Sequence, residues 1–377
     1  MKGAIMRTGS RRKQKGAVAV TVAVFIVFLL GTAALAIDIG NLMVARNELQ
    51  NAADAAALAG AGCLKPRTEC SNATATQPDF TTASATASSF STSNTTNRVQ
   101  GAYVQTSTVA TGYWNATGTP YGLEPLPFTP GANDLAAVQV TIRKDGSNAN
   151  GSIGGFLSGV FGVNVLKASA VATAVLSSPG NVGPGGLFPM AMSQCLYNNY
   201  WNSSTNSPKL SPTSGTVSGF STPQIAGQPY IFQIGSSYQY GTCQSGQWTT
   251  FNVNDNSASY ASSLLTSGNS TTFSVGASPG TWIQTGEKNS IFNDTAACSA
   301  AGNGKCAWAT VVVVNDPTTS GFQPVQAFAC LHILDANNGS QPYVLVQMSN
   351  DMSHCETPNS GGVGPSYGAY TPPRLVQ

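Results

Sequence analysis

Residues 16–61 read GAVAVTVAVFIVFLLGTAALAIDIGNLMVARNELQNAADAAALAGA and predict a long helix at the start of the chain. Its first 22 residues, 16–37, carry no charged side chain. At about 1.5 Å per helical residue they extend roughly 33 Å, enough to cross a hydrocarbon core of about 30 Å. The sequence therefore predicts one membrane-spanning helix, continued outside the membrane to residue 62. The predicted anchoring residues include Gly16, Ala17, Phe25, Leu29 and Ile37.

The residues before this segment predict its orientation. They supply six basic groups, and no acidic residue precedes Asp38. These groups are Lys2, Arg7, Arg11, Arg12, Lys13 and Lys15. Because basic residues stay on the cytoplasmic side of an energised membrane, residues 1–15 are expected to form a cytoplasmic leader. The bulk of the chain is then expected outside the cytoplasm.

A cleavable secretory signal is the alternative, because Ala34-Leu35-Ala36 has the small-x-small pattern of a cleavage site. The apolar stretch is, however, longer than the roughly 7 to 15 residues of a signal core. We expect the segment to be retained as an anchor. Either interpretation exports the rest of the chain.

Composition argues against a nucleic-acid-binding protein. Only 8% of the 377 residues are charged, against about 25% in ordinary globular domains. Outside the leader, 11 basic groups stand against 15 acidic ones, so no clustered positive surface is expected for phosphates. The length favours two folded domains, since domains of about 100 to 200 residues are usual.

Beyond Asp38 the helical pattern continues as a stripe of small residues. Its members recur three and four positions apart, which places them on one helix face. They are Leu42, Ala45, Leu49, Ala52, Ala53, Ala56 and Ala59. Small residues allow close backbone approach, so we expect this face to dock on another element. The partner is either the chain's own following domain or other subunits of an assembly. Gly60, Gly62 and Pro66 are expected to end the helix.

This N-terminal region resembles that of TadG-like proteins of the Tad (tight adherence, Flp pilus) machinery. The matching features are the basic lead into Gly-Ala-Val-Ala, the Ala-Ile-Asp38 membrane exit and the helix Arg46-x-x-Leu49-Gln50-x-Ala52-Ala53-Asp54-Ala55-Ala56-Ala57-Leu58-Ala59. Residues 136–142, 153–161 and 165–175 are also similar to later parts of that family, so the resemblance covers about residues 11–178. It implies a membrane-anchored, extracytoplasmic, non-enzymatic component of pilus assembly or envelope attachment, with protein partners from a pilus or secretion assembly.

One position departs from the pattern of related pilins. Those that a prepilin peptidase processes carry a glutamate five residues after the cleavage glycine, where this chain has Thr21. That glutamate pairs with a neighbouring subunit's amino terminus inside lipid, where an unpaired charge is costly. The resemblance therefore implies neither cleavage after Gly16 nor incorporation into a pilus shaft.

Eight cysteines follow the membrane segment, and an even number in an exported region indicates disulfides. Sequence proximity favours the pairs Cys63–Cys70, Cys195–Cys243, Cys298–Cys306 and Cys330–Cys355, out of about 100 possible connectivities. A zinc site built from Cys330, His332, His354 and Cys355 is the alternative. Its spacings do not match those of zinc fingers, so no metal or cofactor is expected.

The sequence predicts an α+β protein with a boundary after the Tad-like region. Residues 63–176 are expected to form a small α+β, pilin-like domain with a helix at 83–90, strands at 99–109, 136–143 and 163–176, and a short helix at 155–160. Residues 177–186 read as a linker, and the Pro/Gly-rich residues 359–377 as a disordered tail. Between them, residues 187–358 predict a β-rich, disulfide-stabilised domain, either a sandwich or an open barrel. Its expected strands are 188–192, 230–234, 248–253, 272–275, 281–285, 308–314, 326–334 and 343–348.

No catalytic motif stands out, and His332 and His354 are the only histidines for a Ser-His-Asp relay, so we expect no enzyme. Asp255-x-Ser257-x-Ser259 has the spacing of a metal-dependent adhesion motif, but no βαβ alternation surrounds it, and we expect a loop. The alternative function is a surface adhesin or carbohydrate-binding module, with a surface glycan as ligand. Its candidate residues are the aromatics Tyr197, Tyr200, Trp201, Tyr238 and Tyr240.

Overall fold

The computed structural model describes residues 15–73, 77–93, 98–99, 101–115, 117–131, 134–155, 165–216, 222–236, 239–284, 288–318 and 320–377. The predicted leader up to residue 14 and all but the first residue of the predicted helix 155–160 lie outside these ranges. The chain forms two compact units. Unit 1 comprises Met1–Ala52, Thr92–Ser107 and Ile142–Ala170, and unit 2 comprises Ala53–Ser91, Thr108–Thr141 and Val171–Gln377.

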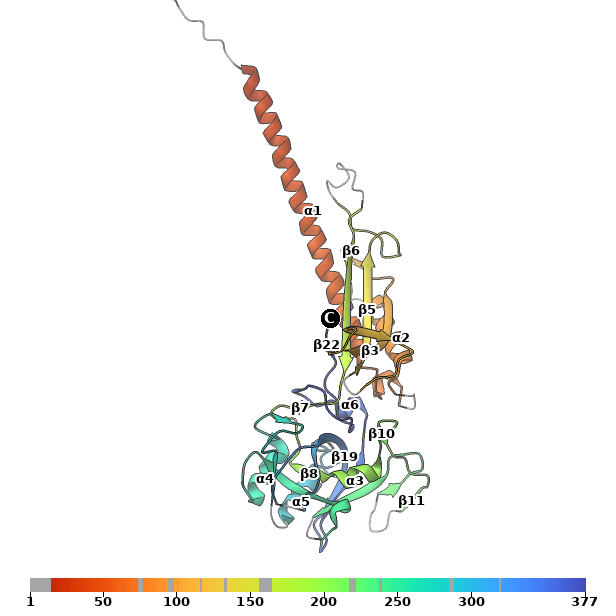
Figure 1. Cartoon of the computed structure of the whole chain (residues 1–377), viewed down its shortest axis with the longest axis vertical. Coiled ribbons are helices and arrows are strands. Elements are labelled where there is room, and N and C mark those ends of the chain that lie inside the picture. Colours follow the sequence, from red (N-terminus) through yellow and green to blue (C-terminus); the bar gives the residue numbers. More distant parts are fainter. Residues whose placement is uncertain are drawn as a thin grey trace, which may run out of the picture. The chain divides into compact units, whose positions relative to one another are not determined.

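Helix α1 runs without interruption over Lys15–Ala61, 47 residues, as the sequence predicts (Figure 1). Within the described chain it is the one helix long and apolar enough to cross a membrane, with a mean hydropathy of 2.7 over its best window. Its end is closed by hydrogen bonds from the amide of Gly62 to the carbonyl of Leu58 and from Cys63 to Gly60. Proline at position 66 follows this closed turn, where the helix cannot continue.

Unit 1 combines the first part of α1 with a small hairpin and the loop after strand β5 (Asp134–Lys144). The hairpin pairs β1 (Arg98–Val99) with β2 (Ala102–Tyr103). The side chain of Asn150 joins this region to the loop, because its Oδ1 accepts hydrogen bonds from the amides of Gln105 and Thr106. Its Nδ2 donates to the carbonyl of Arg143 at 2.9 Å.

A five-stranded sheet in the order β22-β6-β5-β3-β4 lies beside helix α2 (Phe80–Ser93). Its strands are β3 (Thr108–Asn115), β4 (Gly122–Pro125), β5 (Asp134–Lys144), β6 (Ala168–Leu176) and β22 (Arg374–Leu375). The predicted strand 99–109 is thus replaced by the β1–β2 hairpin and by β3, which starts later. Gly101 turns the chain with φ +78°, and β3 continues through Gly112, where a Cβ atom would lie 2.1 Å from the carbonyl oxygen of Glu124.

The C-terminal β-rich region forms a closed barrel. An eight-stranded sheet has the order β13-β20-β19-β17-β8-β14-β16-β18, and an added β13–β14 pairing closes its first six strands into a ring. The strands are β8 (Met190–Ser193), β13 (Ile231–Ser236), β14 (Ser245–Phe251), β16 (Thr281–Ile283), β17 (Trp308–Val314), β18 (Gly321–Gln323), β19 (Ala327–Asn337) and β20 (Tyr343–Met348). Pairs β17–β8 and β13–β14 are parallel. The α+β class and the β-rich unit are as predicted, and the ring is closed rather than open.

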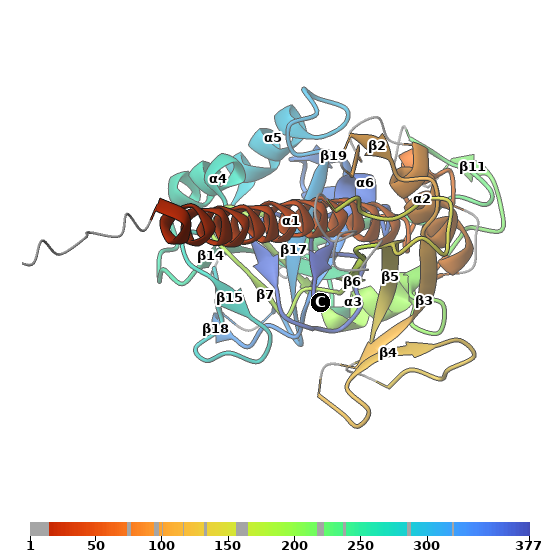
Figure 2. The ribbon, with the colours of Figure 1, turned by 90° about the horizontal axis from the view of Figure 1, so that it is seen from above.

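Short helices pack against this barrel. Two of them, α4 (Ala258–Ser267) and α5 (Asn289–Cys298), lie next to each other (Figure 2). Both contribute to the apolar core, where Phe292 of α5 meets Trp248 edge to face at 5.3 Å between ring centroids. The remaining elements are η1 (Thr68–Cys70), β7 (Asn181–Val182), α3 (Gln194–Tyr200), β9 (Trp201–Asn202), β10 (Ser207–Pro208), β11 (Gly215–Thr216), β12 (Pro223–Gln224), η3 (Thr242–Gln244), β15 (Phe273–Ser274), α6 (Met352–Cys355) and β21 (Ser360–Gly361).

The prediction of a disordered tail at residues 359–377 is wrong. Strand β21 pairs with β7, and β22 pairs with β6, so the tail adds strands to two sheets. Tyr370 and Thr371 are each only 1% exposed. Gly368 has a positive φ, and a Cβ atom at this position would lie 2.1 Å from the carbonyl oxygen of Ser349, too close for any side chain. Proline and glycine here serve tight packing rather than disorder.

The predicted linker, residues 177–186, is likewise part of the folded structure. Strand β7 lies between β15 and β21, and Val182 is fully buried. The hydroxyl of Ser177 lies 3.1 Å from that of Thr371, and the amide of Thr371 donates to the carbonyl of Ser177 at 2.9 Å. This segment therefore joins the barrel to the five-stranded sheet within unit 2.

Candidate functional site

The small-residue stripe of α1 faces the chain's own core. Ala45, Ala53 and Ala56 are 0% exposed, and Leu49 and Ala52 are at most 2% exposed. Leu42, at the end of the stripe nearer the membrane segment, is half-buried. Ala59, at the other end of the stripe, is also half-buried. The five buried members therefore pack within the chain, as the first interpretation predicts.

Close packing continues at Gly60, which directly follows the last residue of the stripe. A Cβ atom on Gly60 would lie 2.8 Å from the carbonyl of Ala83, 2.8 Å from the Cβ of Ala87 and 3.0 Å from Val138. These three residues belong to α2 and β5, so the end of α1 touches both a helix and a strand without room for one more methyl group. The stripe is a packing surface of unit 2 at this end.

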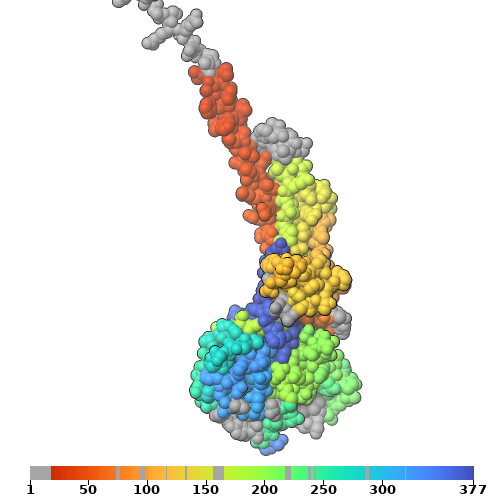
Figure 3. All heavy atoms as spheres, viewed as in Figure 1, coloured from red at the N-terminus to blue at the C-terminus, as the bar shows by residue number. Residues whose placement is uncertain are grey.

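The predicted anchoring side chains lie in the exposed part of α1. Phe25, Leu29 and Ile37 are 62%, 61% and 57% exposed. In Figure 3 the N-terminal half of α1, drawn in red, carries no other coloured element on the visible face. The side chains of Gly16 and Ala17 lie outside the described residues. Exposed apolar side chains on a free helix are what a lipid environment requires.

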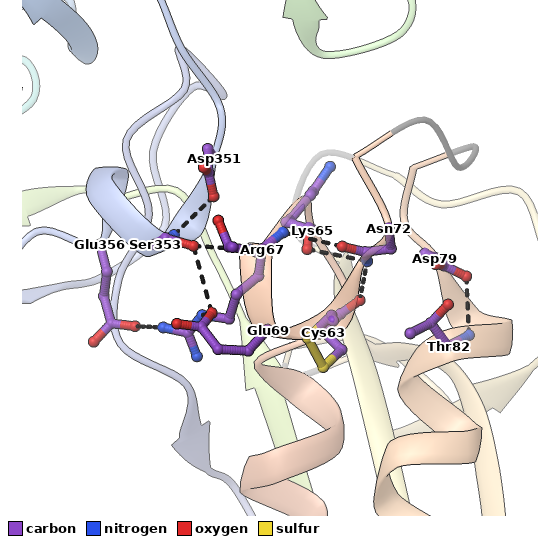
Figure 4. Close-up of a disulfide and its surroundings, with 12 residues drawn as sticks. Cys63, Lys65, Arg67, Glu69, Asn72, Asp79, Thr82, Asp351, Ser353 and Glu356 are labelled. Carbon is purple, nitrogen blue, oxygen red and sulfur yellow. Dashed lines mark hydrogen bonds and ion pairs between the residues drawn. A yellow bond between two sulfur atoms is a disulfide. The ribbon is translucent and has the colours of Figure 1, made fainter.

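Directly after α1, residues 63–72 form a compact segment that we call the brace. A disulfide joins Cys63 to Cys70, with 5.7 Å between their Cα atoms (Figure 4). The buried amide of Asn72 donates to the carbonyls of Cys63 and Lys65 at 2.8 and 3.2 Å. The side-chain oxygen of Asn72 accepts from the amide of Arg67 at 3.0 Å. Asn72 therefore pairs backbone groups of the brace itself, which lie beyond the end of α1.

The brace is bonded to α6 of the barrel region, within unit 2 (Figure 4). The amide of Met352 donates to the carbonyl of Pro66 at 2.7 Å, and the amide of Thr68 donates to the hydroxyl of Ser353 at 2.9 Å. Arg67 and Glu356 form an ion pair with 2.9 Å between Nη2 and Oε2. Both side chains are about one-third exposed, so this ion pair contributes at most about 1 kcal/mol to the stability of the fold.

A buried lysine lies at the start of the brace. Lys65 is 9% exposed, and its ammonium lies 5.9 Å from the centroid of the Tyr370 ring. Burial lowers the pKa of Lys65 to about 8, because the charged form loses its hydration. Burial also raises the pKa of Tyr370, whose ring makes a cation–π contact with the Lys65 ammonium.

All eight cysteines lie in described residues, and the structure joins them in the four pairs that sequence proximity predicts. Besides Cys63–Cys70, these are Cys195–Cys243, Cys298–Cys306 and Cys330–Cys355. Their Cα distances of 4.9, 5.1 and 5.6 Å lie within the range of unstrained bridges. These three disulfides join α3 to η3, the end of α5 to the loop before β17, and barrel strand β19 to α6.

The two histidines stack on one tryptophan instead of converging on a metal. The ring centroids of His332 and His354 lie 4.1 and 4.2 Å from that of Trp308, and both rings are nearly parallel to the indole. The pKa of His332 is lowered, first by burial and also by the charge of His354. Among the described residues, no group of three or more His, Cys, Asp or Glu side chains could hold a metal ion. Sequence reasoning missed Trp308, which its pairing with β19 places beside His332.

The Asp255 motif caps a helix. Asp255 Oδ1 accepts from the amide of Ser257 at 2.6 Å, and the hydroxyl of Ser257 accepts from the amide of Tyr260 at 3.4 Å in the first turn of α4. The hydrogen bonds that Asp255 accepts from Ser257 lower the pKa of its carboxyl group. The motif therefore has a structural role in starting α4.

The aromatic residues considered for glycan binding are mostly core residues. Tyr197 and Trp201 are each 3% exposed. Tyr200 stacks on Phe232 with 3.9 Å between ring centroids, and the ring of Tyr240 occupies the space beside Gly235. Tyr238 lies outside the described residues. The four described rings thus pack within the barrel region and do not form an open platform for a sugar.

Comparison with known families gives two matches that meet at the end of α1. Residues 16–62 match the putative Flp pilus-assembly TadE/G-like family (Tad), and residues 59–174 match the putative Tad-like Flp pilus-assembly family (Tad_C). No curated protein matches the chain, and neither does any solved structure. The two matches cover α1, the brace, α2 and the strands up to β6. Residues 16–174 are therefore similar to Tad-type Flp pilus-assembly proteins, which confirms the resemblance seen in the sequence.

Proposed function

We propose that this protein is a membrane-anchored, non-enzymatic component of Flp pilus assembly that acts outside the cytoplasm. The observation that carries the proposal is the pair of adjoining Tad-type matches over residues 16–174, which begins with the apolar helix α1. Its partners are membrane proteins and other subunits of the pilus or secretion assembly. In this role the protein presents a folded surface and performs no reaction.

The chain's charges and cysteines support the compartment. Six basic groups precede α1 and favour a cytoplasmic N-terminus in the inner membrane. Four disulfides suit an oxidising space outside the cytoplasm. In this arrangement α1 anchors the chain, and the residues beyond α1 lie on the periplasmic or extracellular side.

The brace supports a role for the barrel in the same assembly. Its contacts with α6 join the Tad-like part of unit 2 to the barrel through Pro66, Thr68 and the Arg67–Glu356 ion pair. The barrel is therefore presented together with the Tad-like sheet. We propose that partners bind the outer surfaces of this combined unit, because the small-residue stripe of α1 is already buried.

The test is an in-frame deletion of the gene in the bacterium that encodes it, followed by complementation and counting of surface Flp pili. The wild-type chain is expected to restore pili. A double variant Phe25→Arg/Leu29→Arg is expected to fail, because two charges at the helix centre oppose membrane insertion. The matched control Phe25→Leu/Leu29→Ile keeps the apolar face and is expected to restore pili. Normal piliation in the deletion strain would show that the proposed role is wrong.

A further inference from the structure

The exposed apolar face of α1 extends well beyond Ile37. Leu35, Ile39 and Met43 are 59%, 45% and 63% exposed, and Val44 is 53% exposed. Leu35, Ile39 and Met43 are spaced four residues apart and therefore share one helix face. This face continues the membrane-spanning segment for almost two further turns.

No exposed charge interrupts the face over this distance. Asp38 is the one charged residue between positions 18 and 45, and it is only 6% exposed. The first exposed charged side chain is that of Arg46. At about 1.5 Å per residue, positions 18–45 extend roughly 42 Å, beyond a hydrocarbon core of about 30 Å but close to the 40–45 Å of a whole bilayer with its headgroups.

The opposite face of the same turns is covered by the protein. Ala34 and Asp38 are 4% and 6% exposed, although the adjacent residues Leu35, Ile37 and Ile39 are exposed to solvent. The side chain of Asn41 donates to the carbonyl of Gly154 at 3.1 Å. Gly154 lies in the loop between β5 and β6, and a β-bridge between Ile153 and Leu166 closes the base of this loop. The folded part of unit 1 therefore reaches the same level of the helix as the exposed Ile39 and Met43.

We propose that α1 stays within the bilayer as far as Val44, so that the loop base around Gly154 lies in the headgroup layer and unit 1 rests on the lipid surface. This inference rests on the membrane anchoring in the proposed function. Lipid is the occupant because the face is continuous with the membrane-spanning segment, matches the thickness of a whole bilayer and ends at a basic residue. Arg and Lys at such an end extend their charges toward lipid phosphates.

Charges on unit 1 fit the same surface. Arg143 and Lys167 are exposed and lie on either side of the loop between β5 and β6. The pKa of Asp145 is lowered first by hydrogen bonds from Ser147 and also by the charges of Lys167 and Arg143, which places both basic groups near Asp145. With Arg46, these side chains leave a small positive excess at the lipid-facing end. Anionic headgroups attract basic residues near the membrane surface.

The test places a photoreactive diazirine amino acid at single positions of the full chain in vesicles of phosphatidylethanolamine and phosphatidylglycerol. Positions 39 and 43 probe the proposed lipid contact. Asn47 is the matched control, because it is exposed on the same face one turn further from the membrane. Phe28, 66% exposed inside the apolar segment, tests the anchor itself.

Labelling of lipid at positions 28, 39 and 43, with at least a tenfold drop at 47, is the expected result. Lipid labelling at 28 without labelling at 39 and 43 would overturn the inference and leave the anchor intact, as would crosslinks from 39 and 43 to a second copy or another protein. Absence of lipid labelling at all four positions would contradict the anchor and, with it, the membrane part of the proposed function.

Discussion

The guanidinium of Arg67 lies 2.9 Å from the carboxylate of Glu356, a residue 289 positions later in the chain. This pair connects the segment that follows the anchor helix to the helix α6 that the Cys330–Cys355 disulfide holds against the barrel. The ion pair is accompanied by two hydrogen bonds that use Pro66 and Thr68. The Tad-like part of unit 2 and the barrel are thus joined by specific contacts.

The Arg67→Glu variant is expected to lose about 1 kcal/mol of stability, because two like charges then face each other at a partly exposed site. The double variant Arg67→Glu/Glu356→Arg is expected to recover most of this loss. Thermal unfolding of the three proteins measures it. Glu69→Gln is the control, since its carboxylate is 73% exposed and lies 3.8 Å from Arg67, and it is expected to change little. If the double variant is no more stable than Arg67→Glu alone, the ion pair does not stabilise the contact between the brace and α6.

At the end of α1, Gly60→Ala is expected to destabilise the protein by about 1 to 3 kcal/mol, because the new methyl group overpacks the contact with Ala83 and Ala87. Gly40→Ala in the same helix meets no atom within 4 Å and is expected to stabilise by up to about 1 kcal/mol. Denaturation midpoints in detergent compare the two variants. Equal effects would show that the close packing at Gly60 is absent.

The buried Lys65 predicts a pH dependence. Its pKa is lowered from 10.5 to about 8, so between these values the unfolded chain holds a proton that the folded chain has released. Stability from this group therefore rises with pH above about 8, by at most about 1.4 kcal/mol per pH unit. Below pH 8 both states are protonated and the slope vanishes.

Unfolding curves of the wild type and Lys65→Met between pH 7.5 and about 9.5 isolate this contribution. The difference in stability between the two proteins is expected to shift in favour of the wild type as pH rises. Tyrosines titrate in both proteins and cancel in the comparison, except for Tyr370, whose ring Lys65 contacts. A difference that stays constant with pH would mean that the Lys65 ammonium is well solvated.

The pKa of His332 is lowered by burial and by the charge of His354, and both rings stack on Trp308. Removing the charge in His354→Ala is expected to raise the pKa of His332, because the like charge of His354 contributes to lowering it. Burial remains in the variant, so the pKa should stay below that of a free histidine. The imidazole resonances of His332 followed by NMR measure this shift. An unchanged pKa would show that the two imidazoles do not interact.

Reactivity of the cysteines tests the disulfide framework. Protein taken from membranes and denatured without reduction is expected to bind no alkylating reagent, because all eight cysteines are paired. Reduction should then expose eight thiols. Mass spectrometry of unreduced peptides should recover the short Cys63–Cys70 and Cys298–Cys306 loops as single bridged peptides. Free thiols in the unreduced chain would place it in a reducing compartment.

Local patterns predict much of the fold. The continuous helix over 15–61 follows from an unbroken run of helix formers and apolar residues. Strands such as β17 (Trp308–Val314) and β20 (Tyr343–Met348) agree with the sequence prediction to within a residue, because β-branched runs bounded by turn residues are local signals.

Features that depend on distant contacts could not be predicted in the same way. Ring closure depends on the β13–β14 pairing, and the order of residues 359–377 depends on the strands they join. Helix α5, with the sequence NSIFNDTAAC, has weak helix formers and exists because Ile291 and Phe292 are buried. The sequence shows the small stripe on α1 but does not decide whether it packs inside the chain or on a partner.

A topology reporter tests most directly whether the chain beyond α1 lies outside the cytoplasm. A tandem of alkaline phosphatase and green fluorescent protein, joined through a flexible linker after Gln377, reports the side of the membrane on which the barrel lies. If the chain beyond α1 is exported, as proposed, the fusion is expected to show phosphatase activity without green fluorescence. Green fluorescence without phosphatase activity would place the disulfide-bonded unit 2 in the cytoplasm and contradict the predicted export.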